Sequence, residues 1–431
     1  MKDFARSDSP AVQAQLDRLA ALSVPDGRLG LGTVRELLAR LGHPQDRLPP
    51  VFHVAGTNGK GSVCAFLRAM LEADGKRVHV TTSPHLVRYN ERIRVAGELI
   101  SDHRLAELLA QVLDAGEDLN PSFFEVTIAA AFTEFARVPA DACVVEVGLG
   151  GRFDATNVLP RPAACGIAAL GIDHERFLLA PEEGTPTLPL ARIAFEKAGI
   201  AKPGSPLIAL SYPPEASSEI ERAARVAGAP LHLRGGDWSV AATEVELHYA
   251  DRAGELALPL PALPGAHQAE NAGLAIAMLR HQDHVTVGNK AIAAGLRGAR
   301  WPARMQALGE GPLAALVPGH DLWLDGGHNP NAGEAIARHF AGRKLHLVLG
   351  MLDNKAPRAL IDPLAENIVT LSAVAVPGHA SHPAAAFGAA RSFDSVTEAL
   401  RAIPPDGLPV LIAGSLYLAG EVLRLNGEMP D

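Results

Sequence analysis

The sequence contains only three cysteines in 431 residues, and their positions exclude two kinds of stabilising site. Cys64, Cys143 and Cys165 each lie in an apolar run, and none has the spacing of a metal-ligand motif. Such cysteines are expected to be buried thiols. We therefore expect neither a disulfide framework nor a zinc site.

Long apolar runs and an excess of positive charge are also absent. No stretch reaches the roughly eighteen apolar residues of a membrane span, and residues 1–6 lack the apolar core of a secretion signal. The formal net charge is −9, whereas nucleic-acid binding requires clusters of cations that neutralise phosphates. The sequence thus predicts a soluble cytoplasmic protein that binds neither membranes nor nucleic acids.

What the sequence does contain is the composition of a globular protein, with 48% hydrophobic and 20% charged residues. A chain of 431 residues is too long for one ordinary core, so two domains are expected. Glycine, arginine and proline gather between Leu296 and Pro302, and we interpret this stretch as an interdomain hinge. The predicted domains cover residues 1–297 and 298–431.

The segment Val51–Ser62 has the layout of a phosphate-binding loop. A β-branched and apolar run leads into a turn with three glycines, and an apolar helical segment follows it. Glycines let backbone N–H groups approach a polyphosphate; Lys60 would contact its β- and γ-phosphates, and Ser62 would help to hold Mg²⁺. The loop departs from the common pattern, because Val54 replaces the first glycine and Gly61 separates Lys60 from Ser62. The alternative is a tight turn that binds nothing.

Polar residues follow three further predicted strands. Ser83 comes after the strand at 77–81, Glu146 stands almost at the end of the strand at 142–147, and His174 follows the strand at 164–170. On a βαβ plan these strand ends meet at the sheet edge that carries the phosphate-binding loop. An oxygen-rich set with one imidazole suits Mg²⁺. The alternatives are an exposed carboxylate beyond its strand for Glu146 and an ordinary surface histidine for His174.

The remaining periodicity predicts helices and strands in alternation. Helices are expected within 9–43, at 102–115, at 122–137 and at 190–198, and strands at 243–248, 255–260, 321–324, 345–349, 368–376 and 410–413. Two segments are expected to be loops. One is the arginine-rich segment 88–94, at a sheet edge where ligands bind, and the other is the proline- and glycine-rich segment 181–189.

Together these motifs resemble those of the Mur-ligase superfamily and, within it, of the folylpolyglutamate synthase/dihydrofolate synthase proteins. The matching segments follow the family order along nearly the whole chain: His53–Ser62, Thr82–Leu86, Glu146–Asn157, Asp173–His174, Glu196–Ile200, Gly265–Asn271, Trp301–Met305, Asp325–Pro330 and Gly414–Gly420. The family's loop also has a glycine between the lysine and the serine, which accounts for Gly61. The resemblance implies an α/β fold with an N-terminal P-loop ATPase domain, built on a parallel sheet with helices on both faces, plus a smaller C-terminal Rossmann-like α/β domain.

The activity that the resemblance implies is that of an ATP-dependent amide ligase. ATP would phosphorylate the carboxylate of dihydropteroate or a reduced folate, and the amino group of L-glutamate would attack the acyl phosphate. ATP and Mg²⁺ are the implied cofactors, and a monomer is expected. Three alternatives remain open: an enzyme that carries out polyglutamylation only, a different Mur-type amino-acid ligase, and a nucleotide-dependent regulator without ligase chemistry. The regulator would need no His174, Lys197 or Asp325.

The resemblance also implies roles for individual residues. Expected ATP contacts are Gly56, Thr57, Asn58, Gly59, Lys60, Gly61, Ser62, Asn271, Arg304, Asp325 and His328, and expected metal ligands are Ser83, Glu146 and His174. The pterin or folate is expected near Ser122, Phe123, Phe124, Glu125, Phe153, Asp154 and Ala155. Lys60, His174 and Lys197 are the expected catalytic residues, and Lys197 matches a lysine that family members carry as a carbamate.

Plainer interpretations exist for two of these groups. The alternative for Lys197 is an ordinary lysine that interacts with the end of a helix dipole. The aromatic residues Phe123 and Phe124 are equally well explained as part of a helix packed on the core. Residues 181–189 look like an insertion relative to the family, and an insertion there bears on where Lys197 is placed.

Overall fold

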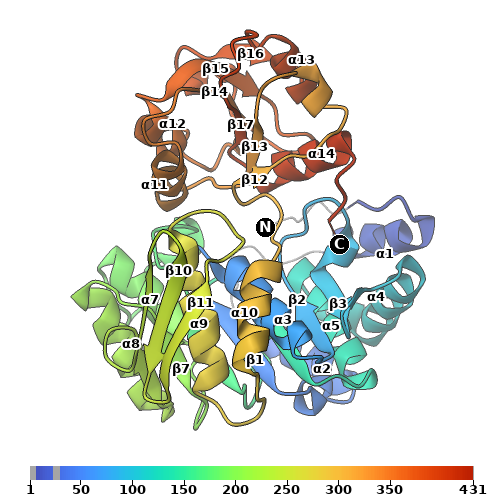
Figure 1. Ribbon diagram of the computed structural model, residues 1–431. Helices are drawn as coiled ribbons and strands as arrows, with labels where there is room; N and C mark the ends of the chain where they lie inside the picture. Colours follow the sequence, from blue (N-terminus) through green and yellow to red (C-terminus); the bar gives the residue numbers. More distant parts are fainter. Residues whose placement is uncertain (1–5, 23–29, 431) are drawn as a thin grey trace. The chain divides into compact units, whose positions relative to one another are not determined.

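Figure 1 shows the computed structural model, which describes residues 6–22 and 30–430. The chain divides into two compact units. The first unit comprises Met1–Pro84, Arg88–Ala262 and Gln268–Arg300, and the second comprises His85–Val87, Leu263–His267 and Trp301–Asp431. Among the described residues, no helix is both long enough and apolar enough to cross a membrane.

The first unit is built on an eight-stranded sheet with the order β4-β3-β2-β5-β1-β6-β7-β8. Its strands are β1 (Val51–Ala55), β2 (Val78–Thr81), β3 (Ile93–Val95), β4 (Glu98–Leu99), β5 (Ala142–Glu146), β6 (Ala164–Ile167), β7 (Leu207–Ala209) and β8 (Leu231–Leu233). The six strands from β2 to β8 in this order run parallel, whereas β3 and β4 pair antiparallel at one edge. The predicted α/β class is confirmed, but the sheet is mixed rather than purely parallel.

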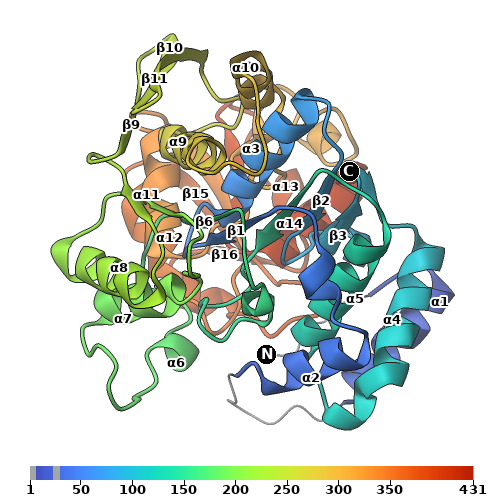
Figure 2. The same ribbon diagram turned by 90° about the horizontal axis from the view of Figure 1, so that it is seen from below.

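Helices cover both faces of this sheet. They are α1 (Pro10–Ala20), α2 (Gly32–Arg40), α3 (Lys60–Ala73), α4 (Asp102–Gly116), α5 (Phe123–Arg137), α7 (Pro189–Ala198), α8 (Pro214–Ala227), α9 (His267–Arg280) and α10 (Asn289–Gly298). In Figure 2, α3, α9 and α10 lie on one side of the strands, and α5, α7 and α8 lie on the other. Residues 23–29 of the predicted helical segment 9–43 lie outside the described residues. Cys64, Cys143 and Cys165 are buried, as predicted.

The prediction of an irregular loop at 88–94 was wrong. Tyr89–Arg92 forms a short 3₁₀ helix that leads into β3, and the side chains of Tyr89, Asn90 and Arg92 are buried. The Arg92 guanidinium lies 5.5 Å from the centre of the Tyr89 ring and 5.4 Å from that of Phe123. Arg94 donates to the Gly97 carbonyl oxygen at 2.7 Å. Stacking and carbonyl acceptors therefore let these arginines lie inside the fold, where the sequence suggests a polar surface.

A separate three-stranded antiparallel sheet follows β8. It consists of β9 (Trp238–Ala242), β10 (Glu246–Asp251) and β11 (Gly254–Pro259). The last two strands agree within a few residues with the predicted ones. The first strand was not predicted, although Trp238 and Val240 point inward and Ser239 outward, as expected of a strand with one buried face.

The second unit contains a six-stranded sheet with the order β12-β13-β17-β14-β15-β16. The strands are β12 (Gln306–Ala307), β13 (Leu322–Asp325), β14 (Leu345–Leu349), β15 (Ile368–Val374), β16 (Arg391–Phe393) and β17 (Val410–Ala413), and the helices are α11 (Pro330–His339), α12 (Arg358–Leu364), α13 (Val396–Arg401) and α14 (Leu416–Asn426). The four predicted strands are present. Two short edge strands, β12 and β16, add to them, and β12 is antiparallel to β13.

Candidate functional site

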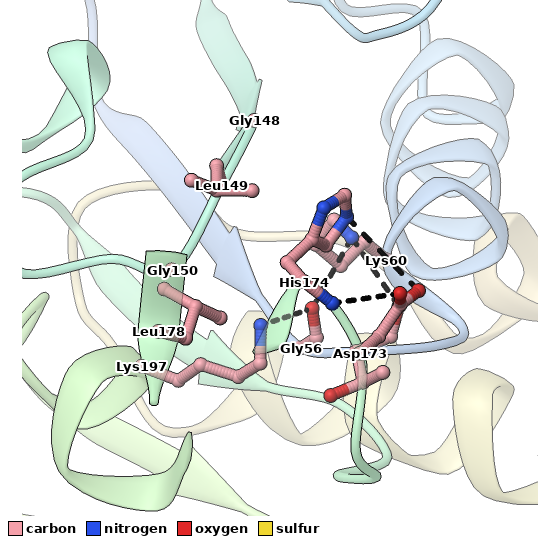
Figure 3. Close-up of a pocket in the computed structure, with 10 residues that line it drawn as sticks. Gly56, Lys60, Gly148, Leu149, Gly150, Asp173, His174, Leu178 and Lys197 are labelled. Atoms are coloured by element: carbon pink, nitrogen blue, oxygen red, sulfur yellow. Dashed lines mark hydrogen bonds and ion pairs between the residues drawn. The ribbon is translucent and has the colours of Figure 1, made fainter. Parts of the chain in front are cut away.

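A small pocket lies at the carboxyl edge of the first unit's sheet (Figure 3). It is formed by the loops that follow β1, β5 and β6, by the short helix α6 (Glu175–Leu178) and by α7. Its lining residues are Gly56, Thr57, Lys60, Gly148, Leu149, Gly150, Asp173, His174, Leu178 and Lys197. The predicted strand-end rim is therefore where the pocket lies, and five of the predicted site residues line it.

The phosphate-binding loop ends at Gly59, which caps α3 in the left-handed region with φ +82°. A Cβ atom on Gly59 would lie 2.4 Å from the Asn271 side-chain oxygen, so both the conformation and the close approach require glycine. The N–H groups of Thr57 and Asn58 donate to the Ala169 carbonyl oxygen at 2.8 and 3.1 Å. These two amides therefore anchor the loop to the segment after β6. The N–H groups of the first turn of α3 have no partner within the helix, and such groups are available to an anion.

Two lysines donate to one backbone carbonyl oxygen in this loop (Figure 3). Nζ of Lys60 lies 3.1 Å and Nζ of Lys197 2.9 Å from the Gly56 oxygen. Burial, and then the charge of Lys60, lower the pKa of Lys197 to about 7, although Asp173 opposes this shift. About half of Lys197 is consequently an uncharged amine at neutral pH.

Asp173 and His174 form the wall that follows β6. The His174 N–H donates to Oδ1 of Asp173 at 2.7 Å, and His174 has a left-handed backbone with φ +54°. A non-glycine residue in this region costs on the order of 1 kcal/mol, which is typical of residues held for a function. Asp173 was not among the predicted site residues, but its place beside His174 at a strand end is the signal that could have identified it.

The other two predicted metal ligands lie at the ends of neighbouring strands. Glu146 is the last residue of β5 and is buried, and Ser83 follows β2. The Ser83 backbone N–H donates to Oε2 of Glu146 at 3.2 Å, so the two residues are neighbours. Carboxylate and hydroxyl oxygens are donors that Mg²⁺ accepts. His174 follows β6, which is separated from β5 by β1 in the sheet, and it lines the pocket.

Helix α9 supports the phosphate-binding loop from the side. Asn271 Nδ2 donates to Oε1 of Gln268 at 3.0 Å, and Gln268 Nε2 donates to Oγ of Ser62 at 3.3 Å. Asn271, Gln268 and Ser62 are all buried. Gln268 was missed by the sequence analysis, although it stands one helical turn before Asn271.

The predicted substrate residues that follow β5 have clear structural roles. Asp154 accepts hydrogen bonds from the N–H groups of Leu149, at 2.7 Å, and Thr156, at 3.0 Å. Thr156 Oγ1 also donates to Oδ1 of Asp154, and the same Oγ1 lies 2.9 Å from Nε2 of His53 on β1. Burial raises the pKa of Asp154. This chain of contacts fixes the Gly148–Gly150 turn, while Phe153 packs under the Arg152 guanidinium and Ala155 is buried.

The predicted substrate residues at the start of α5 divide into two groups. Ser122 and Glu125 form a capping box: Ser122 Oγ accepts from the Glu125 N–H at 3.2 Å, and Glu125 Oε2 accepts from the Ser122 N–H at 2.7 Å. Phe123 packs edge-on against the Tyr89 ring. Phe124 lies against the pocket wall, because a Cβ atom on Gly148 would be 2.6 Å from its ring.

The predicted ATP contacts of the second unit form their own cluster. Asp325 ends β13 and accepts from the N–H groups of Met305, at 2.8 Å, and Gly327, at 2.6 Å. Arg304 lies between Ala303 and Met305, whose φ values are +55° and +43°. His328 Nδ1 is 3.2 Å from the Gly326 oxygen. The structure thus brings Arg304, Asp325 and His328 together around one turn of the second unit.

One further group of side chains in the described structure has the spacing of metal ligands: His320, His346 and Asp406. It lies at the starts of the second unit's strands, the end opposite to Asp325. His346 bonds to Thr370 Oγ1 at 2.8 Å and to Asp406 Oδ1 at 3.0 Å, and His320 to the Leu408 oxygen at 2.7 Å. These contacts account for the group as a link between the strand starts, separate from the predicted magnesium ligands.

The sequence was compared with known proteins. No protein-family model matches it. The dihydrofolate synthase/folylpolyglutamate synthase of Bacillus subtilis is 35% identical over 362 residues, which cover 78% of this chain and 78% of that protein. The Escherichia coli protein of the same name is 33% identical over 410 residues, covering 92% of this chain and 91% of that one.

Solved structures agree with this similarity. Escherichia coli FolC in complex with DHPP and ADP superposes with a TM-score of 0.84 at 31% identity, covering 97% of each chain. A bifunctional folylpolyglutamate synthase/dihydrofolate synthase with Mn, AMPPNP and L-glutamate bound gives a TM-score of 0.83 at 30% identity, covering 97% of this chain and 98% of that one. The predicted family is therefore confirmed: this chain belongs to the dihydrofolate synthase/folylpolyglutamate synthase family.

Proposed function

We propose that this chain is an ATP-dependent ligase that joins L-glutamate to dihydropteroate, forming dihydrofolate, and to reduced folates, forming polyglutamates. The observation that carries the proposal is the pocket in which the phosphate-binding loop, Lys60 and the buried Lys197 meet. The two bacterial relatives described above are named for both synthase activities.

The first step would move a phosphoryl group from ATP to a substrate carboxylate, which requires two anions to be held together. The start of α3 offers N–H groups and the positive end of a helix dipole to the triphosphate. Nζ of Lys60, which rests on the Gly56 oxygen, is placed to turn to the β- and γ-phosphates. The amino group of L-glutamate then attacks the acyl phosphate, a nitrogen proton is released, and phosphate leaves as the amide forms.

Ser83 and Glu146 are the residues that would hold Mg²⁺ together with His174. The hydrogen bond from the Ser83 backbone N–H to the Glu146 carboxylate keeps these two residues adjacent at the strand ends. When bound, the ion would neutralise charge on the transferring phosphoryl group. Solved structures of the family include one with Mn and AMPPNP, which agrees with a divalent cation beside the nucleotide.

We propose that Lys197 reacts with CO₂ and becomes a carbamate. The uncharged amine attacks the carbon of CO₂, an N–C bond forms, and one proton leaves the nitrogen. Lys197 suits this reaction because it is buried, shares the Gly56 oxygen with Lys60, and has its pKa lowered to about 7 by burial. The carbamate would replace a repulsion between two cations with an attraction to Lys60.

We also propose that residues 1–297 form the ATP-binding domain, and that residues 298–431 form a second domain whose Arg304, Asp325 and His328 bind ATP. The clustering of the three residues beside the positive-φ positions Ala303 and Met305 supports this proposal.

The pterin is proposed to lie near Phe124, which packs on the Gly148 turn. A monomeric state and a cytoplasmic location remain predictions from the sequence, and sedimentation equilibrium would test the first.

The test of this function is ligation by the purified protein. With ATP, Mg²⁺ and L-glutamate, we expect ADP and an amide product from dihydropteroate, and again from a reduced folate. Lys60→Ala should lower kcat/KM by roughly a hundredfold or more, the usual loss when one charge-stabilising group is removed. The control is Lys76→Ala, because Lys76 pairs with Asp74 away from the pocket.

The outcomes separate the alternatives. Product from the reduced folate alone would indicate polyglutamylation only. Binding of ATP without any amide product would contradict the ligase function and favour a nucleotide-dependent regulator.

A further inference from the structure

The loop between α6 and α7, residues 179–188, is tied to the walls of the pocket through one side chain. The Glu182 carboxylate accepts hydrogen bonds from Nη1 of Arg152 at 2.9 Å, from Nη2 of the same residue, and from Nη2 of Arg192 at 2.8 Å. The Glu182 carbonyl oxygen accepts from Thr185 Oγ1 at 2.6 Å, which fixes the turn. This loop is the segment that the sequence marks as an insertion.

The two arginines share a second carboxylate, that of Glu196. Arg152 donates to it from Nε at 3.2 Å and from Nη2 at 2.9 Å, and Nη2 of Arg192 lies 3.0 Å from it. The side chains of Arg192 and Glu196 are only 6% and 4% exposed. Two guanidinium groups and two carboxylates balance here. Without Glu182, one carboxylate would face two guanidinium groups in a nearly buried place, which is unfavourable.

Three members of this network, Arg152, Arg192 and Glu196, adjoin segments that line the pocket. Nε of Arg192 donates to the Leu178 carbonyl oxygen at 3.1 Å, and Glu196 directly precedes Lys197. The Arg152 N–H donates to the Glu196 carbonyl oxygen at 2.8 Å. The turn around Arg152 packs directly against the end of α7, because a Cβ atom on Gly199 would lie 2.6 Å from Arg152 Cα. A shift of the arginines would therefore move the pocket walls.

We infer that Glu182 is a positioning residue for the ligase reaction: by bridging Arg152 and Arg192, it holds Leu178, Lys197 and the turn before Arg152 in place. The inference rests on the proposed function, since the walls that it holds belong to the ligase pocket. Misplacement of reacting groups by about 1 Å can lower a rate roughly a hundredfold. Because the Glu182 side chain is 41% exposed, we expect a smaller loss, of about tenfold in kcat.

The test compares Glu182→Gln, which keeps the shape and removes the charge, with Glu183→Gln. Glu183 is the adjacent exposed glutamate and has no ion pair within the described part of the chain. We expect kcat to fall about tenfold in Glu182→Gln and to stay within twofold in Glu183→Gln, by analogy with other positioning contacts. The concentration of CO₂ that gives half-maximal activity should rise only in Glu182→Gln, since Lys197 is the group displaced. Hydrogen exchange of residues 148–152 should accelerate only in that variant.

Two kinetic results, besides the exchange result given below, would overturn the inference. One is equal kcat values and CO₂ dependence for the two variants, and the other is a loss in Glu182→Gln that disappears on cooling and tracks the unfolding midpoint. Hydrogen exchange can be measured without ligase activity, so the ligase function and the positioning role of Glu182 can be rejected independently. Absence of ligation by the unmodified enzyme would reject the proposed function and, with it, the contribution of Glu182 to the ligase rate. Unchanged exchange alongside normal ligation would reject the positioning role alone.

Discussion

At the residue level, the carbonyl oxygen of Gly56 accepts hydrogen bonds from two lysines that would repel each other if both were charged. The buried partner, Lys197, responds by a lowered pKa of about 7, chiefly because of its burial. In the unfolded chain the same group would keep a proton up to a much higher pH. Unmodified Lys197 therefore costs stability below about pH 7, and this cost fades as the pH rises through the alkaline range.

This shift predicts a pH-dependent need for CO₂. The uncharged fraction of Lys197 falls from about one half at pH 7 to about one tenth at pH 6, so carbamate formation at fixed dissolved CO₂ should fall roughly fivefold. We expect the enzyme, after removal of CO₂, to lose activity and to regain it on addition of bicarbonate, more completely at pH 8 than at pH 6. Initial rates of ADP release at fixed CO₂ would measure this.

Two variants provide the controls for this prediction. Lys197→Ala should have low activity that does not respond to CO₂. Lys202→Ala should keep the response, because Lys202 donates to the Asn157 carbonyl oxygen instead of lying in the pocket. Full activity of Lys197→Ala would contradict the carbamate.

Single residues differ in how far sequence could place them. Lys60, His174 and Lys197 line the pocket. Lys60 and His174 were predicted from residue type and from their positions beyond strands, whereas Lys197, on helix α7, was predicted from the family resemblance. For Thr57 and Asn58 the sequence predicts a position in the phosphate-binding loop but not the hydrogen-bond partner of their backbone N–H groups. Those amides donate to Ala169, more than a hundred residues away, and such a partner follows only from how the strands lie side by side.

Among the structural elements, the junction of β1 and α3 depends on a glycine in a strained setting. Gly59 has φ +82°, and its α-carbon faces Asn271, whose side chain is held by Gln268. Gly75, just after α3, has a similar φ of +76° but open space around it. The two glycines separate the effect of backbone conformation from that of crowding.

We predict that Gly75→Ala costs about 1 kcal/mol of unfolding free energy, the usual penalty for a left-handed alanine. Gly59→Ala should cost about 1–3 kcal/mol more, because the methyl group displaces a hydrogen-bonded amide. Chemical denaturation would measure both values, and calorimetry should show weaker nucleotide binding for Gly59→Ala alone. Equal losses of unfolding free energy in Gly75→Ala and Gly59→Ala would show that the Asn271 side chain moves aside at little cost.

Elements were predictable where the hydrophobic pattern is long. Strands β1, β5 and β17 and helices α4 and α5 match continuous apolar runs or a helical period. Strands β3, β4, β12 and β16 contain two or three residues each, too few to show alternation. The ion pairs between Glu182 and the arginines join three segments, and no local pattern specifies such a contact.

For the whole molecule, two units each contain their own hydrophobic core. The sequence predicted one break in the chain, but residues 85–87 and 263–267 also belong to the second unit. Leu86 is an example. A Cβ atom on Gly420 of α14 would lie only 1.9 Å from the Leu86 carbonyl oxygen, and this close packing places Leu86 in the second unit. Contacts of this kind link residues hundreds of positions apart and leave no periodic signal.

A prediction at this scale concerns the contribution of the second unit to catalysis. Arg304→Ala should raise the KM for ATP about tenfold, the order expected for one lost charge-assisted hydrogen bond. Stability should change little, because the recorded contact of Arg304 within the unit is with the neighbouring Ala303 carbonyl oxygen. Steady-state kinetics and thermal unfolding would measure the two effects.

The matched control is Arg338→Ala, on the surface of α11 in the same unit. We expect its KM for ATP to equal that of the unmodified enzyme. If the two variants behave alike, the second unit does not contact the nucleotide through Arg304.

The contacts that run from His53 to the Gly148–Gly150 turn have a consequence for how the enzyme can be studied. Burial lowers the pKa of His53 to about 3, so this imidazole stays uncharged throughout the range in which enzymes are normally assayed. Lys197, in the pocket, changes charge in the middle of that range. The midpoint of an activity titration near neutral pH therefore needs no correction for His53, although this histidine is hydrogen-bonded into the same network.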